Sequence, residues 1–222
     1  MRVFNSLELF FENFKYYFLK IIIKGVIMEH RHHGKSSANF LDSDEILTEL
    51  NLNGNETFLD AGCGDGYISK KAIEDYLPEG KVYAVDAYPE SVRELKEYVD
   101  ENNIENLIPV EADITKTISG VDDESVDVVL MLNVFHGFKE SGQKEDVINE
   151  LKRITKSDGR IAIMDFKPIE MTKGPPIDIR ISHVEMEKIF NQYGLKRDHL
   201  NVDIGEENPQ GKSHYMIIFK KE

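Results

Sequence analysis

The residues from Val126 to Leu132 form a nearly continuous apolar run, interrupted only by Asp127. A strand with this composition is typical of the centre of a parallel sheet, where other elements cover both of its faces. The run therefore predicts a buried parallel sheet, and the segments on either side of it have to provide the neighbouring strands and the covering helices.

Strand-like and helix-like segments alternate along the rest of the chain. Five strands are predicted at 57–60, 81–85, 107–110, 126–132 and 161–166, and two closing strands near 196–204 and 214–219. Apolar spacing predicts helices at 68–76, 91–100 and 147–154, and capping boxes at Asp42 with Glu45 and at Ser182 with Glu185 open two more. A turn at 157–159 precedes the fifth strand, and Gly194 ends the last helix. The alternation predicts a doubly wound α/β fold with right-handed crossovers, whose ligands bind beyond the carboxyl ends of the strands.

The charge and the cysteine content argue against a nucleic-acid partner, a disulfide and a metal site. The chain carries 27 Lys and Arg against 41 Asp and Glu, a formal net charge of −14, without a Lys/Arg cluster, so we expect no nucleic-acid partner. A single cysteine, Cys63, excludes an internal disulfide and a multi-cysteine metal site within the chain. The cluster His30, His32 and His33 binds metal adventitiously at most, so no functional metal site is predicted. We expect a cytoplasmic protein, whose oligomeric state stays open.

Residues 1–35 form an arm that differs in composition from the domain predicted at 36–222. Three lysines interrupt the apolar stretch at 14–27, so we predict neither a transmembrane helix nor a signal peptide there. Two interpretations of the arm remain. It is either a peripheral helix or an extension upstream of a true start at Met28.

A glycine-rich turn follows the first predicted strand, where Gly62, Gly64 and Gly66 lead into a helix. Glycines let a backbone turn sharply and approach a ligand closely. A dinucleotide site favours a further glycine at the position of Tyr67, and a phosphate loop favours Gly-Lys-Ser/Thr, which does not follow Gly66. The bound group is therefore expected to lack phosphate, with a tight turn that binds no ligand as the alternative.

Two carboxylates follow the next strands. Asp86 ends the second predicted strand, where it can accept both hydroxyls of a ribose. Asp113 follows the third, where its carboxylate can accept an adenine amino group while Ile114 packs on the ring. Either acid alone could be a solvated loop residue. Together with the glycine turn, they favour a site for a nucleoside.

These features resemble the class I methyltransferases that depend on S-adenosylmethionine (SAM), especially the small-molecule branch that includes quinone-biosynthesis C-methyltransferases and arsenite methyltransferases. The matching motifs are Leu59-Asp60-Ala61-Gly62-Cys63-Gly64-Asp65-Gly66, Val85-Asp86, Ala112-Asp113-Ile114, Ser125-Val126-Asp127-Val128-Val129 with Asn133-Val134-Phe135-His136, Glu150-Leu151-Lys152-Arg153-Ile154, Asp165-Phe166-Lys167-Pro168 and Gly174-Pro175-Pro176. The resemblance implies a Rossmann-like sheet of seven mostly parallel strands with the last strand antiparallel. The arsenite branch needs several cysteines to hold arsenic, so that activity is not expected here.

The resemblance also implies roles for individual residues. The glycine turn, with Asp60, Gly62, Gly64 and Gly66, would face the methionine part of SAM. Asp86 would bind the ribose, Asp113 and Ile114 the adenine, and Asn133 would lie beside the methyl donor. The cofactor set is thus Asp60, Gly62, Gly64, Gly66, Asp86, Asp113, Ile114 and Asn133.

Methyl transfer needs a general base only if the acceptor is protonated at the start. His136 follows the fourth strand and is the candidate base, and Asp165 at the end of the fifth strand could contact the acceptor. A purely structural role is the alternative for each of them. We therefore expect a SAM-dependent methyltransferase acting on an unidentified small molecule. The alternatives are a SAM-binding or SAM-sensing protein without turnover and a methyltransferase acting on RNA or protein.

Overall fold

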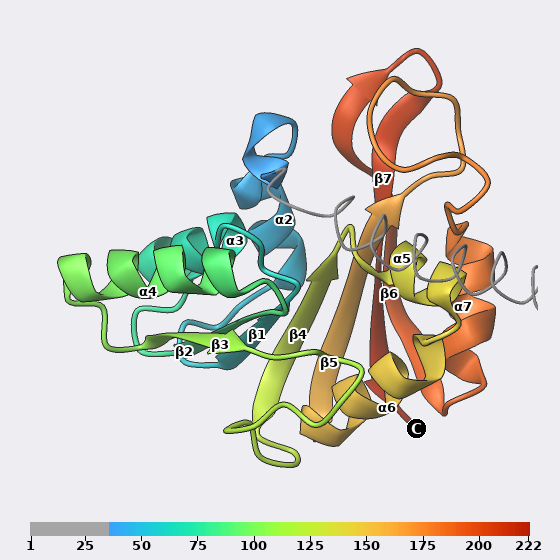
Figure 1. The fold of residues 1–222 in the computed structure, drawn as a ribbon. Coiled ribbons are helices and arrows are strands. Elements are labelled where there is room, and N and C mark those ends of the chain that lie inside the picture. The colour runs from blue at the N-terminus through green and yellow to red at the C-terminus, as the bar shows by residue number, and fades with distance from the viewer. Residues whose placement is uncertain (1–35) are drawn as a thin grey trace, which may run out of the picture. The chain divides into compact units, whose positions relative to one another are not determined.

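A computed structural model describes residues 36–222, which form one seven-stranded sheet (Figure 1). The prediction for residues 1–35 lies outside the described residues. The strand order is β3-β2-β1-β4-β5-β7-β6. The strands are β1 (Thr57–Ala61), β2 (Lys81–Asp86), β3 (Leu107–Glu111), β4 (Val126–Leu132), β5 (Thr155–Phe166), β6 (Leu195–Asn208) and β7 (Gly211–Lys221).

Helices cover both faces of this sheet (Figure 1). They are η1 (Ser37–Asn39), α2 (Ser43–Leu50), α3 (Tyr67–Lys71), η2 (Ala72–Tyr76), α4 (Pro89–Asn102), α5 (Phe135–Ser141), α6 (Lys144–Ile154) and α7 (His183–Asn191). Side chains of α2, α3 and α4 share one hydrophobic core with the sheet, and those of α5, α6 and α7 share a second core on the other face. No helix within residues 36–222 is long and apolar enough to cross a membrane.

The pairing of the strands confirms the predicted fold class. β1 to β5 pair in parallel, and β7 lies antiparallel between β5 and β6. The apolar run of β4 is buried at the centre of the sheet between β1 and β5, as its composition predicts. The carboxyl ends of β1, β2, β3 and β4 consequently meet at one edge, where the candidate site residues follow them.

One local prediction is wrong, two strands are longer than predicted, and one helix was not predicted. The turn predicted at 157–159 is a bulge inside β5, where Asp127 of β4 lies opposite residues 156–159, since Val126 pairs with Thr155 and Val128 with Arg160. The closing strands are longer than expected, and they form a hairpin with a turn at Pro209 and Gln210. The helix α5 lacks any predicted counterpart, because it is too short to show an apolar period.

The capping box predicted for α2 forms only in part. The Asp42 side chain accepts the N–H of Asp44 at 2.8 Å, as an N-cap does. The carboxylate of Glu45 instead accepts the N–H of Gly205 at 3.1 Å and lies 3.6 Å from the Lys212 Nζ. A contact between α2 and the distant β6–β7 hairpin therefore takes the place of the local one.

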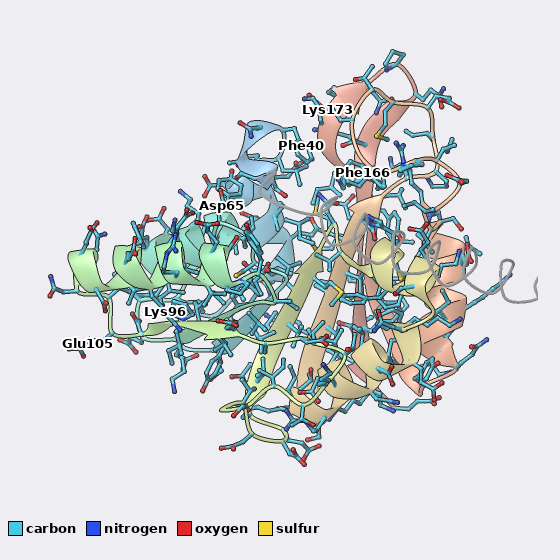
Figure 2. All side chains as sticks on the ribbon, viewed as in Figure 1. Phe40, Asp65, Lys96, Glu105, Phe166 and Lys173 are labelled. Atoms are coloured by element: carbon cyan, nitrogen blue, oxygen red, sulfur yellow. The ribbon has the colours of Figure 1, made fainter. Side chains whose placement is uncertain are left out.

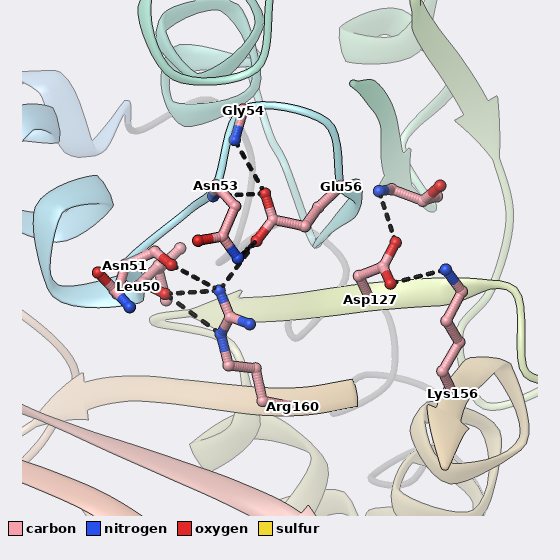
Figure 3. A network of polar contacts seen from close by, with 9 residues as sticks. Leu50, Asn51, Asn53, Gly54, Glu56, Asp127, Lys156 and Arg160 are labelled. Carbon is pink, nitrogen blue, oxygen red and sulfur yellow. Dashed lines mark hydrogen bonds and ion pairs between the residues drawn. The ribbon is translucent and has the colours of Figure 1, made fainter. Parts of the chain in front are cut away.

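A polar network fixes the opposite, amino-terminal edge of the sheet (Figure 3). The buried carboxylate of Glu56 accepts the N–H groups of Asn53 and Gly54, at 2.6 and 3.1 Å. Arg160 lies 3.3 Å from the same carboxylate and donates to the carbonyl of Leu50 at 2.8 Å. These contacts join the loop before β1 to β5. The network is structural, because it lies at the end of the strands away from the candidate site.

Candidate functional site

The three glycines of the turn after β1 all adopt left-handed backbone conformations, with φ of 82° at Gly62, 54° at Gly64 and 75° at Gly66. A Cβ at Gly62 would lie 2.7 Å from the Val134 side chain, and one at Gly66 would lie 2.7 Å from the Leu95 side chain. Those two glycines therefore permit close packing. A Cβ at Gly64 would meet no atom within 4 Å, so this part of the turn faces open space in which a ligand could approach the backbone.

Asp86 ties the glycine turn to the end of β2. Its Oδ2 accepts the N–H of Gly64 at 2.8 Å, and its Oδ1 accepts the N–H of Tyr88 at 2.8 Å. An ionised carboxylate has about four lone-pair sites, so both oxygens keep acceptor capacity for ribose hydroxyls. The carboxylate thus has a structural role that the sequence did not indicate, and that role places it beside the open side of Gly64.

Asp60 lies beneath the turn rather than in the open space. Its side chain is buried and its Oδ2 accepts the hydroxyl of Ser69 at 2.7 Å, which links β1 to α3. Burial, helped by the nearby charges of Asp86 and Asp65, raises the pKa of Asp60 to about 7. The carboxyl group is therefore a structural link, and its predicted contact with a cofactor stays a prediction.

Asp113 and Ile114 follow β3 at the same edge. The Asp113 Oδ1 accepts the N–H and the hydroxyl of Thr115, at 3.0 and 2.7 Å, and Lys116 lies 3.0 Å from its Oδ2. Although partial burial acts to raise it, these hydrogen bonds lower the pKa of Asp113 overall. Ile114 is buried in the core on the α5–α7 face. Asp113 stays partly exposed and available to a ligand.

Asn133 follows β4 in a left-handed conformation, with φ of 60°, which is uncommon for a residue other than glycine. Its N–H donates to the carbonyl of Met164 at 2.9 Å, and its Oδ1 lies 3.0 Å from the Nε2 of His214. Its buried Nδ2 has no hydrogen-bond partner among the residues that the structure describes. A buried amide donor without a protein partner is a feature of a site that a ligand completes.

The two predicted catalytic residues contact each other. The Nδ1 of His136, on α5, lies 2.9 Å from the Oδ1 of Asp165, at the end of β5. The carboxylate also accepts the N–H of His136 at 3.1 Å and the N–H of Phe166 at 2.8 Å. Both side chains are buried. A carboxylate that accepts Nδ1–H fixes the tautomer in which Nε2 is the basic nitrogen, as in the general bases of other enzymes.

Sequence reasoning missed several side chains at this edge. The Tyr67 hydroxyl donates to the carbonyl of Leu41 at 2.9 Å and accepts the N–H of Ser43 at 3.0 Å, which holds the start of α2 against the glycine turn. The Phe40 ring, just before Leu41, lies 6.1 Å from the Phe166 ring at the end of β5 (Figure 2). The only sequence signal for Tyr67 was the absence of a glycine at its position.

His214 was missed as well. It is buried on β7, and its ring lies 4.1 Å from the Phe166 ring. A polar pair, Ser213 and His214, at the start of an apolar strand could have drawn attention to it. Its partner Asn133 precedes it by 81 positions, so only the fold brings the two together.

The glycine turn, Asp86, Asp113, Asn133 and the His136–Asp165 pair thus follow the carboxyl ends of five neighbouring strands, which is the edge where ligands bind in sheets of this kind. Within residues 36–222 no group of three or more His, Cys, Asp or Glu side chains could hold a metal ion. The cluster His30, His32 and His33 lies outside the described residues.

Comparisons with known proteins agree with this geometry. The family model described as "Methyltransferase domain" matches residues 52–216. The arsenite methyltransferase of Halobacterium salinarum is 34% identical over 110 residues, which are 50% of this chain and 27% of that protein. The malonyl-[acyl-carrier protein] O-methyltransferase of Acetivibrio thermocellus is 25% identical over 168 residues, which are 75% of this chain and 49% of that protein. The chain therefore spans less than half of the length of these curated relatives.

Among solved structures, a SAM-dependent methyltransferase from Aquifex aeolicus superposes with a TM-score of 0.69 and 28% sequence identity, over 81% of this chain and 89% of that one. The match of the family model covers most of the chain and includes the glycine turn, Asp86, Asp113, Asn133 and the His136–Asp165 pair. The chain belongs to the methyltransferase domain family and has the fold of the class I methyltransferases that depend on SAM.

Proposed function

We propose that this chain binds SAM at the glycine turn and transfers its methyl group to a small molecule in the cytoplasm. The observation that carries the proposal is the open space at Gly64, where a Cβ would meet no protein atom, beside the carboxylate of Asp86. Gly64 would admit the methionine part of the cofactor, Asp86 would bind the ribose hydroxyls and Asp113 the adenine amino group. These donor and acceptor types fit a nucleoside that carries an amino acid.

When bound, SAM supplies a methyl group on a positively charged sulfur. The chain has to hold the methyl acceptor in line with that group and to keep water away, and such positioning contributes on the order of 7–11 kcal/mol in favourable cases. Asn133 and the His136–Asp165 pair lie at the ends of β4 and β5, beside the glycine turn that follows β1. The methyl acceptor is expected to bind there.

The His136–Asp165 pair supports an acceptor that carries a proton on its nucleophilic atom. Asp165 holds Nδ1–H, so Nε2 of His136 can accept a proton as the bond to the methyl group forms. This chemistry suits a hydroxyl group or another weakly acidic O–H or N–H. An acidic chain of formal charge −14 favours a small molecule over RNA as the acceptor.

The site at Gly64 can be tested with a matched pair of variants. Gly64→Ala should weaken SAM binding at least tenfold in calorimetry, because the new methyl group occupies the ligand space and no protein atom has to move. Gly120→Ala is the control, since Gly120 also has a positive φ, 85°, and open space around it. Both variants place a Cβ on a backbone with positive φ, which costs about 1–2 kcal/mol. Equal SAM affinity in the two variants would place the cofactor elsewhere.

The acceptor requires a separate experiment. Incubation of the protein with methyl-labelled SAM and a metabolite extract should give a labelled small molecule, which mass spectrometry would identify. Label recovered only in RNA or protein would contradict the small-molecule proposal. Binding of SAM without any transfer of label would favour a SAM-binding or SAM-sensing protein.

A further inference from the structure

A chain of hydrogen bonds runs from the β6–β7 hairpin to Asn133. The N–H of Glu206 donates to the Ser213 Oγ at 2.9 Å, and that oxygen lies 2.6 Å from the Nδ1 of His214. The Nε2 of His214 in turn lies 3.0 Å from the Oδ1 of Asn133. The imidazole therefore bridges two side chains that have no charge.

The donor and the acceptor can be assigned in each of these hydrogen bonds. Burial lowers the pKa of His214 to about 4, although the nearby Asp165 acts to raise it, so the ring is neutral at neutral pH. A neutral imidazole has one N–H and one acceptor nitrogen. Because the Ser213 oxygen already accepts from Glu206, its hydroxyl hydrogen can donate to Nδ1, which leaves the ring proton on Nε2. That N–H then donates to the Oδ1 of Asn133.

Close packing keeps the imidazole in place. A Cβ at Gly205 would lie 2.8 Å from both the His214 Nδ1 and the Ser213 Oγ, so only glycine leaves room for the pair. On another side the Phe166 ring lies 4.1 Å from the imidazole ring, and His214 is fully buried. The orientation of the Asn133 amide is consequently set by the hairpin, with Oδ1 toward His214 and Nδ2 away from it.

We propose that His214 is a positioning residue, which acts through Asn133 to present the amide Nδ2 to the carboxylate of the methionine part of SAM. Nδ2 is buried without a partner among the described residues, and Val134, the next residue, packs against Gly62 of the glycine turn. The amide thus lies beside the turn that is expected to receive the methionine part. The inference rests on the proposed function, and S-adenosylhomocysteine, which keeps the carboxylate, is a suitable probe.

The experiment compares two ligands by calorimetry. His214→Phe keeps a buried ring but loses the donor, so its affinity for S-adenosylhomocysteine should fall about tenfold, the effect of one hydrogen bond. Its affinity for methylthioadenosine, which lacks the amino-acid part, should not change. His214→Gln retains an N–H donor near the position of Nε2 and should bind S-adenosylhomocysteine within about threefold of the wild type.

Two further variants separate positioning from a general structural effect. In an Asn133→Ala background, His214→Phe should cause no additional loss, because it acts only through Asn133. Tyr215→Phe is the matched control, since the adjacent residue is equally buried and points to the other face of the sheet. This variant should bind both ligands as the wild type does.

Nitrogen NMR of the unliganded protein gives a readout that does not depend on binding, and it should show His214 in the neutral Nε2–H tautomer between pH 6 and 8. The opposite tautomer would overturn the inference. So would unchanged affinity for S-adenosylhomocysteine in His214→Phe, equal losses for both ligands, or additive losses in the double variant. If the wild type binds neither ligand while the tautomer is as expected, the proposed function has failed rather than the link between His214 and Asn133.

Discussion

Two buried histidines at the same edge of the sheet have different partners. His136, on the face covered by α5–α7, contacts the carboxylate of Asp165, whereas His214, on the face covered by α2–α4, contacts a hydroxyl and an amide. A carboxylate stabilises an imidazole that takes up a proton, and neutral partners do not. The two histidines thus differ in their partners and not in their burial: the carboxylate fits the base proposed for His136, and the neutral partners fit the bridge proposed for His214.

The largest effect expected from this difference is on stability. Asp165→Ala should lower the free energy of unfolding by about 3–5 kcal/mol, as for one partner of a buried pair, because it leaves buried donors of His136 and Phe166 without an acceptor. Ser213→Ala removes a neutral partner of both His214 and the Glu206 N–H and should cost less, about 1–2 kcal/mol. Urea denaturation of both variants measures the difference. Equal losses would show that the two histidines are held alike.

The pH dependence of stability should reveal the neutral state of His214. Its folded pKa of about 4 lies below the ordinary 6.5, so the unfolded chain binds the extra proton between these values, and the contribution to stability is lost as the pH falls through that window. A variant without the imidazole does not lose this stability at low pH. The stability of His214→Phe relative to the wild type should therefore rise by about 1 kcal/mol when the pH is lowered from 6 to 5.

Asp60 should change the stability with pH in the opposite direction to His214, which provides a second test. Its folded pKa of about 7 lies above the ordinary 3.8, so the folded chain binds the extra proton in between, and its contribution falls as the pH rises. The two groups offset each other in the wild type. The stability of Asp60→Asn relative to the wild type should fall by about 1 kcal/mol when the pH is lowered from 6 to 5. Parallel stability profiles for wild type, Asp60→Asn and His214→Phe would contradict both assignments.

The smallest effect concerns Tyr215, which lies opposite Asp165 in the pairing of β5 with β7. Its buried hydroxyl has no hydrogen-bond partner among residues 36–222. Tyr215→Phe removes this unsatisfied group and should leave the free energy of unfolding unchanged or raise it by up to about 1 kcal/mol. A loss of more than 1 kcal/mol in urea denaturation would mean that the Tyr215 hydroxyl forms a hydrogen bond. Tyr215 would then have to be added to the His136–Asp165 pair.

The half of the domain from β1 to β4 was largely predictable from the sequence. The glycine turn, Asp86 and Asp113 follow strands whose apolar residues mark them clearly, and parallel strands bring their carboxyl ends to one edge. Local signals suffice there, because each of these residues depends on the strand directly before it. The second half was less predictable, since the bulge in β5 and the length of the β6–β7 hairpin depend on pairing between strands.

The sequence by itself determined the class of fold, the edge of the sheet that carries the candidate site and the individual candidates His136 and Asp165. Only the tertiary structure decided which side chains meet. It paired His136 with Asp165 across 29 positions and His214 with Asn133 across 81, and it turned Glu45 from a local cap to a contact with Gly205. The physical reason is that a hydrogen bond requires two groups within about 3 Å, and apolar periodicity carries no information on which distant polar groups will meet that condition.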